Sequence, residues 1–494
     1  MPLVFFFVVV IAVAAFAAIM LRRSGGNYLL SIFQFLFAFA VLYGYGLYNA
    51  REGITFHYGE AVLPSCWLAV SLGFLGIVLG YTRAVNATPP GWRHLLSATN
   101  PDRLGTVGLV LAVIGVAGEI RFIQLSGGVE DYFSAARGAG DYEHVSAYVY
   151  GARWLLFPGV AFLLAAGMKK KAWHGPGIVL LAVMAAYNLL LGQRSGIFAV
   201  AILGLYCAML WRRKIPNLIT VAAVGCVLAV LLGFVKLTRD DYHLGSDFKR
   251  SKELLQSLDA GAVLELATAN FAVIKDKEDP SHMSEIVLFA GFIKTIPSEV
   301  DYDYFVFYTA FLYKWIPRVW WPDRPDPSKE KVVELDRLLG KTHRTGSTPT
   351  ILGMYYLHLG YLSVFFMAAL TGYYLGVIDS FGRRAMTHPA AAVVFVTLSN
   401  GVLSMPMGLG PLASMSSLLP FSIVPMLAGL WWAAEPHVGR TLQAGSRSAR
   451  RGVLRRRPGD GTVTSPMDST SSGSVGRSAP EGRGSLRRSG SPTD

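Results

Sequence analysis

The chain has 494 residues, of which 52% are apolar and only 16% are charged, and it contains three cysteines. A soluble domain usually carries about a quarter charged residues. This composition excludes an ordinary soluble domain, and so few cysteines exclude a disulfide-rich secreted scaffold.

The apolar residues come in blocks of about 17–24 with almost no charge, which is the length needed to cross a hydrocarbon core of roughly 30 Å. We therefore expect an all-α polytopic membrane protein with about eleven spanning helices. The expected spans are 2–21, 28–48, 61–81, 104–124, 145–168, 172–191, 195–211, 216–236, 350–378, 389–405 and 412–432.

The first block could also be a signal peptide, but its amino-terminal part has no positive charge. Its arginines, Arg22 and Arg23, follow the apolar run. We interpret the block as a retained anchor with the N-terminus outside the cell.

The distribution of Lys and Arg predicts the orientation. Alternate short loops, beginning with the one that holds Arg22 and Arg23, carry 13 basic and 2 acidic residues. The long loop 237–346, between the eighth and ninth spans, carries 15 basic and 18 acidic residues. The short basic loops and the C-terminus should therefore be cytoplasmic, and the long loop should be extracytoplasmic.

This pattern divides the chain into a transmembrane domain, 1–434, and a tail, 435–494. The tail is rich in Ser, Gly, Arg and Pro and has no apolar periodicity, so we expect it to be disordered and basic. The net charge of +13 is then explained by cytoplasmic loops and tail, so we expect membrane lipids as partners and no nucleic acid.

Common cofactor and metal motifs are missing from the sequence, including a P-loop, a dinucleotide-binding glycine motif, HExxH and paired CxxC. Cys66, Cys207 and Cys226 all fall inside expected spans. We therefore predict no cofactor, no metal site and no disulfide framework.

Arg194 stands in a short turn, Leu-Gly-Gln-Arg-Ser-Gly, that is expected at the outer face. A turn this short needs small residues but needs no arginine, and the positive-inside rule disfavours a cation there. Arg194 could simply extend to a lipid phosphate. Alternatively, a guanidinium fixed between two helix ends suits bidentate binding of phosphate, on the order of 4 kcal/mol per charge pair at an effective dielectric near 20.

The long loop contains an aromatic segment that includes Trp320 and Trp321 and is too short to span. Their flat faces suit sugar rings, although anchoring at the membrane interface is the commoner role. Arg318 and Arg324 lie in the adjoining proline-rich sequence and are further candidates for anion contacts. Ordinary surface ion pairs with nearby aspartates are the alternative.

The ninth span should begin with Thr348 as N-cap and Pro349 at the first helical position, at the membrane surface. Such a helix N-terminus attracts anions. His343 and Arg344 precede it, and His358 lies about two turns inside the span, where a structural hydrogen bond is the expected role.

These segments resemble the bacterial O-antigen and oligosaccharide repeat-unit polymerases (the Wzy type), which are related in layout to O-antigen ligases. The resemblance rests on the Arg194 turn and on two motifs in and after the long loop. The first comprises Pro317, Arg318, Trp321, Pro322 and Pro325, and the second comprises Thr348, Pro349, Gly353, Tyr356 and Gly360. Many relatives have an acidic residue where this chain has Met354, so a catalytic carboxylate cannot be assigned to that position.

The resemblance implies a GT-C-like helical bundle in the bacterial cytoplasmic membrane and a metal-independent glycosyltransferase. Its substrate would be a polyprenyl-diphosphate-linked oligosaccharide, with a chain-length regulator or a flippase as partner. The candidate residues for such a reaction are Arg194, with His343 or Asp323 as base, for catalysis, and Arg318, Arg324, Arg344, Trp320, Trp321 and Tyr356 for binding diphosphate and sugar.

Two other functions stay open. A ligase of the WaaL type uses the same donor with a different acceptor. An exporter or flippase of lipid-linked glycans would need a polar path through the bundle, and charged residues within the spans are sparse: Glu119, Arg121 and Arg153 lie near outer ends.

Overall fold

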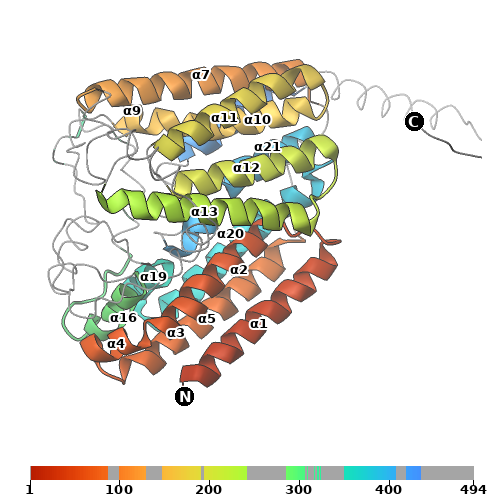
Figure 1. The fold of residues 1–494 in the computed structure, drawn as a ribbon. Coiled ribbons are helices and arrows are strands. Elements are labelled where there is room, and N and C mark those ends of the chain that lie inside the picture. Colours follow the sequence, from red (N-terminus) through yellow and green to blue (C-terminus); the bar gives the residue numbers. More distant parts are fainter. Residues whose placement is uncertain are drawn as a thin grey trace, which may run out of the picture. The chain divides into compact units, whose positions relative to one another are not determined.

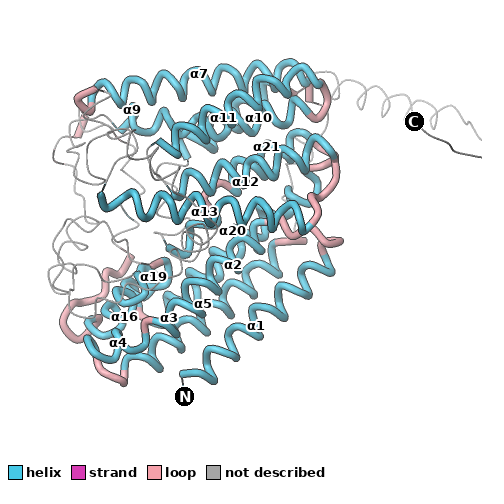
Figure 2. The backbone as a smooth tube through the Cα atoms, in the orientation of Figure 1, coloured by secondary structure: helices cyan, strands magenta, loops and turns pink. Residues whose placement is uncertain are grey.

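The regular secondary structure of the described residues is helical throughout (Figures 1 and 2). The computed structural model describes residues 2–86, 99–128, 147–190, 194–241, 285–305, 350–407 and 419–434, with the single residues 309, 316, 320, 321 and 323. The chain divides into two units, Met1–Val438 and Gly439–Asp494. The second unit lies outside the described residues, as does the rest of the predicted tail, so every described helix belongs to the first unit.

Six of the described helices are long and apolar enough to cross a membrane. They are α1 (Pro2–Arg23), the run of α2 (Ser31–Phe39), η1 (Ala40–Gly46) and α3 (Leu47–Asn49), α5 (Val62–Ala84), α7 (Pro101–Leu125), η3 (Lys171–Trp173) with α11 (His174–Leu190), and α20 (Tyr361–Ala385). Eighteen residues of helix measure about 27 Å, close to the thickness of a hydrocarbon core. Six such helices indicate a multi-pass membrane protein.

The other described helices are shorter or have shorter apolar stretches, and most of them lie in the remaining expected spans. They are α4 (Arg51–Tyr58), α9 (Ala147–Ala152), η2 (Arg153–Leu155), α10 (Leu156–Gly167), α12 (Arg194–Arg212), α13 (Leu218–Asp241), α16 (Glu285–Thr295), α19 (Ile351–Leu359), α21 (Pro389–Ser399), η5 (Val402–Met407), η6 (Leu419–Ile423) and α23 (Val424–Ala433). The prediction of an all-helical membrane protein is confirmed, whereas the number eleven stays a prediction.

Helices α5 and α20 pack at very close range because glycines line both faces. A Cβ added at Gly80 would lie 2.7 Å from the backbone nitrogen of Tyr373 and closer still to the carbonyl of Ala369. On the opposite helix, a Cβ at Gly372 would overlap the backbone of Ile77. Small residues at four-residue spacing let two helix backbones approach in this way, and close van der Waals packing then replaces the hydrophobic drive that lipid removes.

A second glycine-lined contact joins α7 to α10. A Cβ at Gly108 would lie 2.9 Å from the backbone of Leu163, and one at Gly115 would lie 2.9 Å from the backbone nitrogen of Leu156. Gly159 contributes from α10, where a Cβ would meet the backbone of Ala112 at 3.0 Å. This contact holds α7 in register with α10, which directly follows Arg153.

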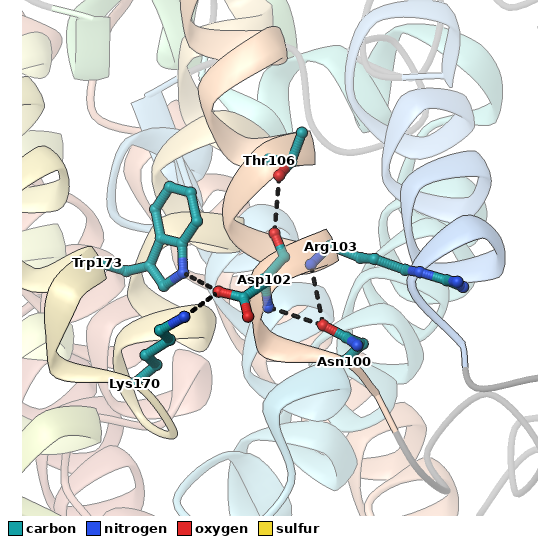
Figure 3. A network of polar contacts seen from close by, with 6 residues as sticks. All are labelled: Asn100, Asp102, Arg103, Thr106, Lys170 and Trp173. Atoms are coloured by element: carbon teal, nitrogen blue, oxygen red, sulfur yellow. Dashed lines mark hydrogen bonds and ion pairs between the residues drawn. The ribbon is translucent and has the colours of Figure 1, made fainter.

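Polar contacts join the start of α7 to the turn between α10 and α11 (Figure 3), and Arg103 also reaches the end of α23, where its Nη1 donates to the carbonyl of Trp432 at 3.4 Å. Asp102 Oδ1 accepts hydrogen bonds from Lys170 Nζ at 2.8 Å and from Trp173 Nε1 at 3.4 Å. The guanidinium of Arg103 lies over the ring of Trp432, 5.8 Å from its centroid. These three chain segments therefore share one end of the bundle.

Other contacts extend this end of the bundle. Arg213 Nη2 donates to the carbonyl of Met168 at 3.3 Å, and Arg383 Nη1 donates to Asn86 Oδ1 at 3.4 Å. The alternate loops that sequence charge assigns to one side of the membrane are thus grouped together in space. That this side is the cytoplasm stays a prediction.

A buried carboxylate ties several helices together near the same end. Asp379 of α20 is fully buried and accepts from the backbone N–H of Ser31 at 2.7 Å, from that of Ile32 at 3.1 Å, and from the hydroxyl of Tyr81 at 3.0 Å. The Ser31 hydroxyl lies 2.9 Å from that of Ser399 on α21. The carboxylate therefore satisfies the first N–H groups of α2, which would otherwise be orphaned in the interior.

The expected single span 350–378 is wrong, because the chain reverses at Gly360. This glycine has φ +63° and separates α19 from α20. The hydroxyl of Tyr355 on α19 lies 2.5 Å from that of Thr371 on α20. In one continuous helix these residues would be about 24 Å apart, so α19 is a half-length helix folded back along α20.

The expected position and surroundings of this helix N-terminus are also wrong. The N-cap is Thr350, whose hydroxyl accepts from the N–H of Gly353 at 3.2 Å, and not Thr348, which lies outside the described residues. Thr350 is fully buried. Tyr43, in the π-helical segment η1, accepts from the N–H of Leu352 at 3.0 Å. The N–H groups at this helix end thus find partners inside the protein instead of facing anions at the membrane surface.

Two more span predictions need correction. The region 237–346 is more than a loop, because α13 extends to Asp241 and the apolar helix α16 is almost wholly buried against α19 and α5. The span 389–405 is not a continuous helix, since α21 ends at Ser399 and Gly401, with φ +82°, precedes the 3₁₀ segment η5.

Candidate functional site

Arg194 is the first residue of α12, at the end of the bundle away from the basic loops. Helix α11 ends at Leu190, and residues 191–193 lie outside the described residues, so the connection is short. A Cβ at Gly196 would overlap the side-chain amide of Asn188. The last turn of α11 and the first turn of α12 therefore meet closely, and position 196 requires glycine for this approach.

An ion pair inside the helical bundle lies at this same end. Arg153 Nε is 3.0 Å from Glu119 Oε2, and the two side chains are only 16% and 10% exposed. The hydroxyl of Tyr187 donates to the other carboxylate oxygen of Glu119. The guanidinium carbon lies 4.9 Å from the ring centroid of Phe122. Three elements, α7, η2 and α11, thus converge on this ion pair.

The geometry of this pair follows from close helix packing. A Cβ at Gly118 would lie 3.2 Å from the backbone nitrogen of Arg153. With no side chain at position 118, α7 comes close enough for Glu119 to reach the cation. Arg153 also begins the 3₁₀ segment between α9 and α10, and such interruptions of a helix often mark a hinge or a functional position.

A second buried polar pair lies where α19 ends. His358 Nδ1 is 3.1 Å from Asp303 Oδ2, and the His358 ring is stacked on Phe305, with centroids 4.9 Å apart. The backbone N–H of Asp303 donates to the carbonyl of Leu357 at 2.9 Å. The structural hydrogen bond predicted for His358 is confirmed, and it fastens the segment after α16 to α19.

Tyr356, predicted to bind substrate, is buried among protein side chains. It is 5% exposed, and its hydroxyl lies 3.5 Å from the carbonyl of Ile296. Its ring meets that of Tyr361 edge-on at 5.1 Å. In this structure the side chain packs α19 against the end of α16.

Three of the site residues predicted in the long loop are described, and all are exposed at the surface. Trp320 is 79% exposed and Trp321 is 40% exposed, and Asp323 is also exposed. Large exposed indoles suit either a membrane interface or a sugar face. The other predicted site residues of this region lie outside the described residues: Arg318, Arg324, His343 and Arg344.

Metal-binding side chains do not gather anywhere in the part of the chain that the structure describes. No group of three or more His, Cys, Asp or Glu there could hold a metal ion. The three cysteines are free; Cys66 and Cys207 are buried and Cys226 is exposed.

The Glu119–Arg153 pair is the feature that sequence reasoning does not assemble. The sequence places both residues near the outer ends of their spans, but it does not pair them with each other. The usable signal is depth, because Glu119 lies about one and a half turns and Arg153 about two turns inside the outer ends of two consecutive spans. Tyr187 gives no sequence signal, since only the packing of α11 brings it to the carboxylate.

The comparisons with known proteins identify one region of similarity. Residues 142–384, a little under half of the chain, match a family described as a domain of unknown function, DUF8712. This region runs from α9 to the end of α20 and includes Arg153 and Arg194. No curated protein and no solved structure matches the chain.

Proposed function

We propose that this protein polymerises polyprenyl-diphosphate-linked oligosaccharide repeat units at the outer face of the bacterial cytoplasmic membrane. The observation that carries the proposal is Arg194 at the first position of α12, after a short connection from α11. A cation there is disfavoured by the positive-inside rule, and a helix N-terminus adds partial positive charge of its own.

The resemblance to repeat-unit polymerases supports the same function. It involves the Arg194 turn, the Pro-Arg-x-x-Trp-Pro-x-x-Pro segment of the long loop, and the sequence around α19. An all-helical bundle with six membrane-length helices suits a lipid-linked substrate, because the polyprenyl chain can remain in the bilayer while its diphosphate stands at the surface.

In the proposed reaction, a sugar hydroxyl of the acceptor attacks the anomeric carbon of the donor glycan. The bond between that carbon and the diphosphate oxygen breaks, and the diphosphate leaves with the electron pair. The hydroxyl proton passes to a base, for which His343 and Asp323 are the candidates. Arg194, supported by Arg318, Arg324 and Arg344, would stabilise the charge that develops on the leaving diphosphate.

A ligase-type transfer is the alternative that the same residues would also serve. It uses the same donor and the same cation, and it differs only in the acceptor. Export of lipid-linked glycans without chemistry is less favoured, because the buried charged residues described within the spans lie far apart, with Glu119 and Arg153 at one end of the bundle and Asp379 near the other.

The test is Arg194→Ala in the full-length protein, expressed in the source bacterium in place of the wild-type gene. We expect long polymer to disappear while single lipid-linked units accumulate and membrane insertion is unchanged. The matched control is Arg121→Ala, which removes an exposed guanidinium from the same end of the bundle. Persistence of long polymer in the Arg194 variant would show that the diphosphate-binding role is wrong.

A further inference from the structure

The contact between α7 and α10 does not depend on the Glu119–Arg153 pair. Helices α7 and α10 already meet through Gly108 and Gly115, whose missing side chains allow backbone contact. Withdrawing two charges from water is costly, and apolar residues of similar size often serve packing equally well. Ionisable groups within membrane-spanning segments usually belong to a functional site for that reason.

The pair also lies beside the turn that carries the proposed diphosphate-binding residue. Tyr187, which donates to Glu119, and Asn188 are consecutive residues in the last turn of α11. Asn188 contacts the first turn of α12, which Arg194 begins. The same helix end therefore touches both the charge pair and the start of α12.

We infer that Arg153 is a second guanidinium for the diphosphate of the lipid-linked substrate, and that Glu119 and Tyr187 hold it in position while the site is empty. The inference rests on the proposed function. A diphosphate has two phosphoryl groups, and a guanidinium binds phosphate oxygens in the same bidentate manner as a carboxylate. The substrate would replace Glu119 as the partner of Arg153, and the Tyr187 hydroxyl would still satisfy the released carboxylate.

The experiment measures binding of farnesyl diphosphate to the full-length protein in phosphatidylcholine nanodiscs by isothermal titration calorimetry. The Glu119→Gln variant should bind severalfold more tightly than wild type, because the competing negative charge is gone. The double variant Glu119→Gln/Arg153→Gln keeps a neutral pair. Compared with Glu119→Gln alone, it should bind farnesyl diphosphate at least about tenfold more weakly, as expected for the loss of one charge-assisted contact. Arg121→Gln, the matched control, should bind like wild type.

Each outcome decides the inference. Unchanged affinity in both the single and the double variant would overturn it and leave a purely structural pair. If the double variant does not fold, as judged by thermal unfolding, the single variant decides alone, since unchanged affinity there is also contrary. A phospholipid headgroup is the alternative ligand of Arg153. It would be indicated if phosphatidylglycerol nanodiscs weaken the binding of farnesyl diphosphate to the wild-type protein but not to the double variant.

The outcomes also separate this inference from the proposed function. If the wild-type protein does not bind farnesyl diphosphate, the inference about Arg153 fails, whereas the proposed function is decided separately by polymer formation in the Arg194→Ala variant. If it binds and Arg194→Ala abolishes polymer, while the Glu119 and Arg153 variants bind like wild type, only the inference about Arg153 fails.

Discussion

Replacing Gly80 by alanine tests whether close backbone contact holds α5 against α20. The added Cβ would lie 1.8 Å from the carbonyl oxygen of Ala369, and ordinary van der Waals contact requires about 3.5 Å. The helices must therefore separate by about 1.7 Å, because backbone atoms cannot rotate away as a side chain can. Overpacking of this kind costs about 2–3 kcal/mol, and the higher helix propensity of alanine returns nearly 1 kcal/mol.

The expected net loss is roughly 1–2 kcal/mol of unfolding free energy. The matched control is Gly204→Ala on α12, where an added Cβ would meet nothing within 4 Å. That variant should gain up to about 1 kcal/mol through helix propensity alone. Both are measured by SDS titration in mixed micelles, with tryptophan fluorescence as the signal. Equal stabilities for the two variants would refute the idea that glycine is required for this contact.

Two further predictions concern the buried carboxylate and the orientation of the chain. Asp379→Asn should destabilise the protein by about 2–4 kcal/mol in the same SDS titration. The new amide nitrogen would face N–H and O–H donors whose hydrogen bonds the carboxylate now accepts. A loss below about 0.5 kcal/mol would contradict this account. Single cysteines placed in a cysteine-free protein test the orientation: Trp320→Cys should react with an impermeant maleimide in intact cells, and Lys170→Cys should react only after the membrane is opened. The reverse pattern would invert the predicted topology.

Much of the fold could be predicted from apolar run length and charge alone. Most of the described helices coincide with expected spans because any segment crossing a bilayer must satisfy its backbone hydrogen bonds internally, and helix formation is the local solution. The grouping of the loops around Arg103, Lys170 and Arg213 follows from counting Lys and Arg. These are local properties of the chain, so no tertiary information is needed for them.

The breaks in the helices could not be predicted in this way. The reversal at Gly360 leaves an apolar run that looks like one span, because glycine occurs both in continuous membrane helices and at turns. Helix α16 escapes prediction because eleven residues are too few to span a membrane, and only its burial against α19 and α5 explains its apolar character.

The candidate site likewise has a part that the sequence predicts and a part that it does not. Sequence alone determined that Arg194 is a cation in a short turn where the charge rule disfavours one, because turn length and charge bias can both be read along the chain. Only the tertiary structure decided that Arg153 meets Glu119 and that Tyr187 joins them, since these residues come from three separate helices. Their distances depend on how closely the helices pack, and that depends on glycines whose facing partners lie far away in sequence.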